Sequence, residues 1–167
     1  VVWGREDSRM SNSRVIRAAF EYAAPTTVQE ALNILREGKT KVLAGGTDLL
    51  NTIKMEGLQA SRLLYLMNCR ELDYISFAEG KLKIGATATL TQIEKNETVA
   101  EHYPALREAI HVIGGTQIRN MATLAGNLCN ASPGADTPPV LISLGAQVEV
   151  AKPADGGLER RIIPVEE

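Results

Sequence analysis

Two short glycine-bearing segments hold most of the residues in this chain that could bind a ligand. The first consists of Leu43, Ala44, Gly45, Gly46, Thr47, Asp48 and Leu49. The second runs from Gly114 to Leu128 and contains Thr123, Gly126 and Asn127. Glycine lets a backbone approach a ligand closely, and hydroxyl and amide groups bond phosphate and sugar oxygens. The two segments therefore predict two sides of one site for a phosphate-bearing ligand.

The first segment has the order strand, glycine pair, helix. A buried strand over 41–44 stops at Gly45–Gly46, and a helix begins at Thr47 or Asp48 and continues to about Met55. Unpaired N–H groups at such a junction suit an anion. A carboxylate beside phosphate is unfavourable, so we expect Asp48 to cap the helix or hold the loop. An ordinary glycine turn with an N-cap remains an alternative interpretation.

The second segment is richer in polar side chains. Thr123 and Asn127 can bond ligand oxygens, and Asp136, which follows a Pro-Gly-Ala turn, can accept from hydroxyls or a ring N–H. Arg119 has two interpretations, an anion ligand or a surface or partner contact, and we favour the second. The segment could also be a buried loop whose polar groups only satisfy the backbone.

Other catalytic and metal-binding patterns do not fit. No G-x-G-x-x-G follows a strand, and Gly38-Lys39-Thr40 ends a helix where a P-loop would begin one. Cys69 and Cys129 lie far apart without metal-ligand spacing, and His102 and His111 are isolated. We therefore predict no metal ligand and no catalytic side chain.

The composition excludes several classes of partner. The net charge of the 167 residues is −2 and aromatic residues make up 4% of them, which argues against a nucleic-acid surface. No apolar run approaches the length of a membrane span, and residues 1–10 lack the apolar core of a secretory signal. We expect a cytoplasmic protein without a membrane span.

The elements that must position these residues indicate an α+β protein. Residues 1–19 form an N-terminal arm, residues 20–58 a first subdomain and residues 59–167 a second. The first subdomain begins with a strand at 20–22 and a helix over 28–35, capped by Thr27 and Glu30. The second begins with a strand at 62–66 and a hairpin over 75–84. Helices at 89–95, 98–112 and 138–144 and strands at 147–151 and 160–163 follow, the last two joined by a turn at 156–157.

Taken in order along the chain, several short motifs resemble one known family. They are Phe20-Glu21-Tyr22 with Pro25, Leu43–Leu49, Leu82–Ala86, Gln117–Thr123, Asn127-Leu128, Ser132-Pro133 and Asp136. The family is the FAD-binding medium subunit or domain of the molybdenum hydroxylases, which include xanthine dehydrogenase and carbon monoxide dehydrogenase. The resemblance extends from about Phe20 to Glu167. It implies a PCMH-type fold in which two α/β subdomains hold FAD between them.

The resemblance also implies a place in a larger enzyme. Substrate would be oxidised at a molybdopterin centre on a large subunit. Electrons would then pass through [2Fe–2S] clusters of a small subunit to this flavin, and on to NAD or another acceptor. This chain would be an oxidoreductase component that positions FAD, with no acid or base of its own.

The family's functional positions can be carried over to this sequence. Leu43–Leu49 would wrap the pyrophosphate, Ile84 and Gly85 would line the site, and Ile113 would be an apolar contact. The remaining contacts, to the diphosphate, the ribityl chain or the cofactor generally, would come from Thr123, Gly126, Asn127 and Asp136.

The chain departs from the family pattern in two places. Ala125 stands where the family usually has glycine, and its methyl group would crowd the cofactor or disfavour a positive φ. The family also continues into a C-terminal domain, whereas this sequence stops at Glu167. These departures keep one alternative open, a non-catalytic assembly or scaffold fragment that has lost FAD.

Overall fold

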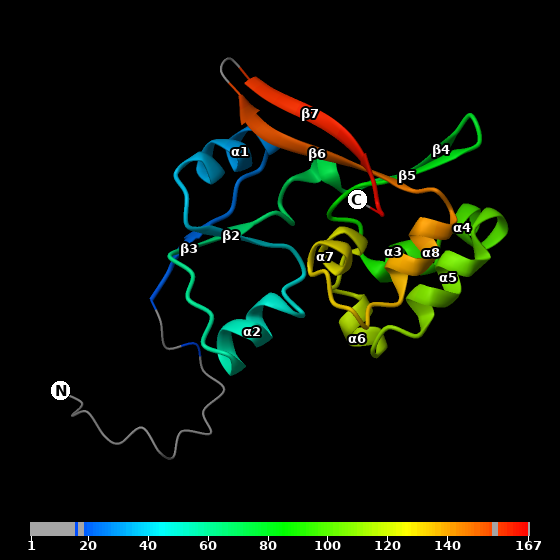
Figure 1. Cartoon of the computed structure of the whole chain (residues 1–167), viewed down its shortest axis with the longest axis horizontal. Coiled ribbons are helices and arrows are strands. Elements are labelled where there is room, and N and C mark those ends of the chain that lie inside the picture. Colours follow the sequence, from blue (N-terminus) through cyan, green and yellow to red (C-terminus); the bar gives the residue numbers. More distant parts are fainter. Residues whose placement is uncertain (1–15, 17–18, 155–156, 167) are drawn as a thin grey trace.

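The computed structural model describes residue 16, residues 19–154 and residues 157–166. The predicted N-terminal arm lies almost entirely outside these residues. A three-stranded parallel sheet forms the first lobe, with β1 (Glu21–Ala23), β2 (Thr40–Leu43) and β3 (Arg62–Tyr65) in the order β1-β3-β2. Helices α1 (Val28–Arg36) and α2 (Leu49–Met55) make the two crossovers and lie on opposite sides of the sheet (Figure 1).

The capping signal predicted for α1 is present, with one change. The Thr27 hydroxyl accepts from the Glu30 N–H at 3.2 Å. The Glu30 carboxylate, however, accepts from the N–H of Thr26 at 2.9 Å, one residue before the N-cap. This hydrogen bond is the largest cause of a Glu30 pKa below its ordinary value. Ala31 and Leu32 then form the buried face of the helix.

Strand β3 lies in a different place from that expected. The sequence analysis assigns residues 62–66 to the second subdomain, but β3 is the middle strand of the first sheet, paired with both β1 and β2. Leu63 and Leu64, adjacent along the strand, are both fully buried. A parallel strand covered on both faces has a continuous apolar run rather than an alternating one. The adjacent leucines of β3 therefore indicate, from local sequence alone, a strand in the middle of a sheet.

The second lobe is mainly helical and has its own hydrophobic core (Figure 1). A short 3₁₀ turn, η1 (Arg70–Leu72), leads to the predicted hairpin of β4 (Ile75–Ala78) and β5 (Lys81–Ile84). Helix α3 (Leu90–Glu94) starts with a capping box between Thr89 and Gln92. Leu90, Ile93, Val99, Leu106 and Ile110 fill the core between these elements.

The single helix predicted over 98–112 is two helices. Helix α4 (Glu97–His102) ends at Tyr103, and α5 (Pro104–His111) begins with Pro104 in its first turn. Proline has no N–H to donate and its ring clashes with the preceding turn, so a helix starts at proline more easily than it passes through it. The break turns α5 toward α3 and α8 (Thr137–Ser143).

Two helices lie inside the second glycine segment, where the sequence analysis assigns no helix. They are α6 (Thr116–Arg119) and α7 (Leu124–Cys129). The chain closes with an antiparallel hairpin of β6 (Gln147–Ala154) and β7 (Gly157–Pro164), both longer than predicted. This hairpin extends from the helical lobe to α1, so it spans both lobes (Figure 1). Within the described ranges, no helix has the length and apolarity needed to cross a membrane.

Candidate functional site

The two glycine segments meet through their backbones. A Cβ atom built on Gly45 would lie 1.8 Å from the carbonyl oxygen of Met121 and 2.9 Å from the amide nitrogen of Ala122. Any side chain at Gly45 would therefore push the segments apart. Gly46 contributes differently, because its φ of +74° is a conformation that favours glycine. The structure thus brings together the two halves of the predicted site.

The first segment offers backbone donors and few polar side-chain contacts. Leu43 is buried in the core of the first lobe, while residues 44–47 are partly exposed. No described residue accepts a hydrogen bond from the N–H groups of Gly45, Gly46, Thr47 or Asp48. Unpaired N–H groups in a partly exposed loop are the donor set that a diphosphate requires. The chemistry of this loop therefore fits an anionic group.

Asp48 does not have the capping role expected of it. It is the N-cap residue of α2, but its side chain makes no capping hydrogen bond, because its backbone is already helical, with φ −99° and ψ −54°. A capping side chain normally needs an extended backbone at that position. The loop is closed instead by the Asn51 amide, which donates to the carbonyl oxygen of Thr47 at 2.7 Å.

Polar side chains hold the second segment in place. The Thr123 hydroxyl, on a residue 2% exposed, accepts from the Gly126 N–H at 3.0 Å and caps α7. A Cβ on Gly126 would lie 2.9 Å from that hydroxyl, so a side chain at this position would require the hydroxyl to shift. The structure thus gives Thr123 a capping role, whereas the sequence analysis gives it a ligand-binding role.

Asn127 is oriented by a residue that the sequence analysis did not single out. The hydroxyl of Thr137, which is fully buried, donates to the Asn127 side-chain oxygen at 2.5 Å. This bond occupies the acceptor of the amide and leaves its N–H₂ group as the donor. Asp136, the exposed N-cap residue of α8, directly precedes Thr137. No local pattern in the sequence signals a contact between residues ten positions apart.

Ala125 does not have a positive φ, one of the two effects considered for its methyl group. It is the second residue of α7, and its φ is not among the positive values found at Lys39, Glu79 and Ala131. The N–H groups of Leu124 and Ala125 have no acceptor among the described residues, as is normal in the first turn of a helix. Alanine at this position therefore presents the same backbone donor that glycine would.

Ile84 and Gly85 are less closely connected to the two segments. A Cβ on Gly85 would lie 2.0 Å from the carbonyl oxygen of Leu72, so packing alone accounts for this glycine. Ile84 packs against the core of the second lobe. The chain after β5 comes closer to the site at Leu90, whose N–H donates to the Ala122 carbonyl oxygen at 2.8 Å.

Arg119 is not the exposed surface residue that the sequence analysis favours, and its hydrogen-bond partners lie within the protein. It is buried, and it donates to Glu94 and to three backbone carbonyl oxygens of residues 111–114. Hydrogen bonds from His111 and then Arg119 hold the Glu94 pKa below its ordinary value, against an opposing effect of burial. These contacts fix the backbone around Ile113, the predicted apolar contact.

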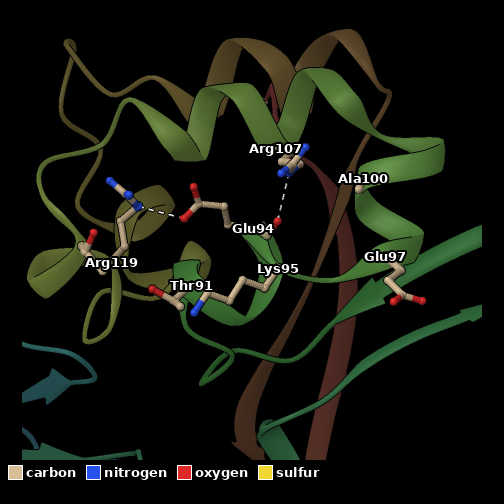
Figure 2. A pocket seen from close by; sticks show the side chains of 8 residues that line it. Thr91, Glu94, Lys95, Glu97, Ala100, Arg107 and Arg119 are labelled. Carbon is tan, nitrogen blue, oxygen red and sulfur yellow. Dashed lines mark hydrogen bonds and ion pairs between the residues drawn. The ribbon is translucent and has the colours of Figure 1, made fainter.

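A surface pocket of about 510 Å³ lies beside this network, between α3, α4, α5 and α6. Figure 2 shows Glu94, Lys95 and Arg107 in its wall. Of the two glycine segments, only Thr116 and Arg119 reach this pocket. The site predicted from the sequence is therefore the contact between the segments, and the pocket is a separate feature.

Comparison with known proteins identifies the family of the chain. The family described as "FAD binding domain in molybdopterin dehydrogenase" matches residues 18–167. The chain is 36% identical over 134 residues to the xanthine dehydrogenase FAD-binding subunit of Escherichia coli O157:H7, covering 79% of this chain and 46% of that one. It is also 36% identical over 132 residues to the nicotinate dehydrogenase FAD-subunit of Eubacterium barkeri, covering 77% of this chain and 45% of that one.

A solved structure shows the same fold. Carbon monoxide dehydrogenase from Hydrogenophaga pseudoflava superposes with a TM-score of 0.84 and 31% identity, covering 91% of this chain and 52% of the matching chain. The chain spans about half the length of the curated relatives it matches. The family match and the shared fold together assign the chain: it belongs to the family of FAD-binding domains in molybdopterin dehydrogenases.

Proposed function

We propose that this chain binds FAD where its two glycine segments meet, with the loop 43–49 around the diphosphate. One observation carries the proposal. Gly45 packs directly against Met121 and Ala122, and the residues after Gly45 and Ala122 include backbone N–H groups without an acceptor among the described residues. Two such sets of donors in contact suit a ligand with two adjacent phosphates.

Side chains in the second segment and close to it in the sequence complete the proposed site. The Asn127 N–H₂ group, oriented by Thr137, is a donor to the diphosphate or ribityl oxygens. Asp136 accepts from a hydroxyl or ring N–H of the cofactor, and Ile113 provides an apolar contact. Ala125 supports this proposal over the scaffold alternative, because alanine in a helical conformation keeps the backbone donor of α7.

The proposed role is that of an electron-transfer component in a molybdenum hydroxylase complex. Bound FAD would supply the redox chemistry, with electrons arriving from [2Fe–2S] clusters of a small subunit and leaving to NAD or another acceptor. Substrate would be oxidised on a separate molybdopterin subunit. The residues of this chain bind and orient the cofactor, and none of them is proposed as an acid or a base.

The visible spectrum of the purified chain tests the proposal. We expect flavin absorbance, with release of FAD in nearly equal proportion to protein after denaturation. A colourless preparation should take up added FAD, with a change in flavin fluorescence. A folded protein that neither contains nor takes up FAD would contradict the proposal and favour the scaffold alternative.

A matched pair of variants locates the site. Thr47→Val removes a partly exposed hydroxyl from the first segment, and we expect FAD to bind about tenfold more weakly if that hydroxyl bonds the diphosphate. Thr98→Val makes the same change in α4, away from both segments, and should leave the dissociation constant for FAD unchanged. Equal affinities for the two variants would remove Thr47 from the site.

A further inference from the structure

Arg119 is a buried charged side chain that the proposed function does not use. It is only 8% exposed. Its Nε donates to Glu94 Oε2 at 2.9 Å, a bond drawn in Figure 2. Its Nη1 lies 3.1 Å from the carbonyl oxygens of His111 and Ile113 and 3.0 Å from that of Gly114. A guanidinium bonded in this way within the protein is a brace for the loop 111–114.

The hydrogen bonds from Arg119 to the carbonyl oxygens determine which way the N–H groups of this loop point. In a trans peptide, the C=O of one residue and the N–H of the next point in opposite directions. The described residues include no cis peptide bond. Because the carbonyl groups of Ile113 and Gly114 point at the guanidinium, the N–H groups of Gly114 and Gly115 point away from it. Neither of these N–H groups donates to a described residue.

The braced loop is continuous with the contact between the glycine segments. Helix α6 follows the loop directly and ends at Arg119. Two residues later, Met121 packs against Gly45, and the Ala122 N–H donates to the Ile118 carbonyl oxygen at 2.8 Å. Arg119 therefore joins the loop to the part of the chain that meets the first segment.

We propose that Arg119 is a positioning residue for the cofactor, which holds residues 112–115 so that Ile113 and the N–H groups of Gly114 and Gly115 face FAD. This inference rests on the proposed function. Glu94 fixes the orientation of the guanidinium, and its other carboxylate oxygen lies 2.6 Å from His111 Nδ1. Arg119 acts through the loop and does not itself touch the cofactor.

The substitution Arg119→Lys, made in the full chain, tests the inference. Lysine keeps the charge, but a single ammonium group cannot reproduce the planar set of donors that reaches Glu94 and three carbonyl groups. We expect faster amide hydrogen exchange in residues 112–118 of the FAD-free protein, measured by mass spectrometry. We also expect FAD to bind about tenfold more weakly, because binding must then order the loop, and the visible circular dichroism of bound flavin to change.

Arg107→Lys is the matched control. Arg107 lies in the wall of the same pocket, and its Nε donates to the backbone oxygen of Glu94 at 3.1 Å, without a bond to residues 112–115 (Figure 2). This variant should bind FAD within about twofold of the unsubstituted chain. Unchanged exchange or unchanged FAD affinity in Arg119→Lys would overturn the inference.

The two proposals fail in distinguishable ways. If the unsubstituted chain binds no FAD, the proposed function fails and the positioning role fails with it. If the chain binds FAD and Arg119→Lys binds it equally well, only the positioning role fails.

A second variant serves if Arg119→Lys does not fold. Glu94→Gln weakens the hold of Arg119 on the loop while keeping Arg119 itself. Faster exchange in 112–115 with weaker FAD binding would then support the inference, and wild-type values of either would overturn it.

Discussion

The first glycine segment, 43–49, and the second, 114–128, both contain backbone N–H groups without an acceptor among the described residues, but the two segments are held in place differently. The first contacts the second through Gly45, whose missing side chain lets two backbones touch. The second is held by side chains: Arg119 on the loop carbonyls, Thr123 on the first turn of α7, and Thr137 on Asn127.

This difference teaches what kind of change each segment tolerates. The first segment needs empty space, so an added methyl group should damage it more than the loss of a polar group. The second needs particular hydrogen bonds, so the loss of a hydroxyl or carboxylate should damage it even where volume is conserved. The substitutions below test that distinction, from the largest expected effect to the smallest.

Gly45→Ala should have the largest effect. The new methyl carbon would lie 1.8 Å from the Met121 carbonyl oxygen, so the two segments must separate. We expect a loss of about 3 kcal/mol in the free energy of unfolding, measured by urea denaturation, and loss of FAD uptake. Gly157→Ala is the control, since a Cβ there meets no atom of the described part of the chain within 4 Å. Wild-type stability and FAD uptake in Gly45→Ala would show that the segments do not touch as described.

Thr137→Val should have a smaller effect that is confined to the second segment. It keeps the volume of a fully buried side chain but removes the hydroxyl that donates to Asn127. We expect a loss of about 1–3 kcal/mol in the free energy of unfolding and weaker FAD binding, because the Asn127 amide loses its orientation. Thr137→Ser retains the hydroxyl and should bind FAD with the affinity of the unsubstituted chain. If serine and valine behave alike, the hydroxyl does not orient Asn127.

Glu94→Gln should change the dependence of stability on pH. Because the folded Glu94 pKa is depressed, its stabilising contribution is present above the ordinary glutamate pKa, about 4.3, and is lost as pH falls through the lower folded value. The variant should therefore lose less stability than the unsubstituted chain between pH 6 and pH 3, in urea titrations at each pH. Glu97→Gln, in the wall of the same pocket, should follow the unsubstituted chain.

The local parts of this fold could be predicted from the sequence. The strand–glycine–helix junction at 43–49, the hairpin at Glu79–Gly80 and the Thr27 cap each depend on residues within a few positions of one another. Turn and capping chemistry is visible at that range. The shared chemistry of the two glycine segments predicted that they form one site, and the resemblance to a family implied FAD as its ligand.

The contacts that hold the second segment could not be predicted in this way. Arginine is mostly exposed in proteins, and nothing beside Arg119 signals that its partners are backbone carbonyl groups. Thr137 and Asn127 are ten residues apart on different helices. The position of β3 depends on which strands pair, and that is decided by tertiary packing.

Thr87→Val should have the smallest effect on stability. It tests whether a buried hydroxyl matters only when it makes a hydrogen bond within the site. Thr87, like Thr137, is fully buried, but within the described residues its hydroxyl has no hydrogen-bond partner. Replacing an unsatisfied buried hydroxyl with a methyl group removes a desolvation penalty and conserves volume. We expect stability to stay equal or to rise by up to about 1 kcal/mol, in the direction opposite to Thr137→Val, with FAD affinity unchanged. A loss of FAD affinity in Thr87→Val would instead place the hydroxyl in contact with the cofactor and extend the site into the segment after β5.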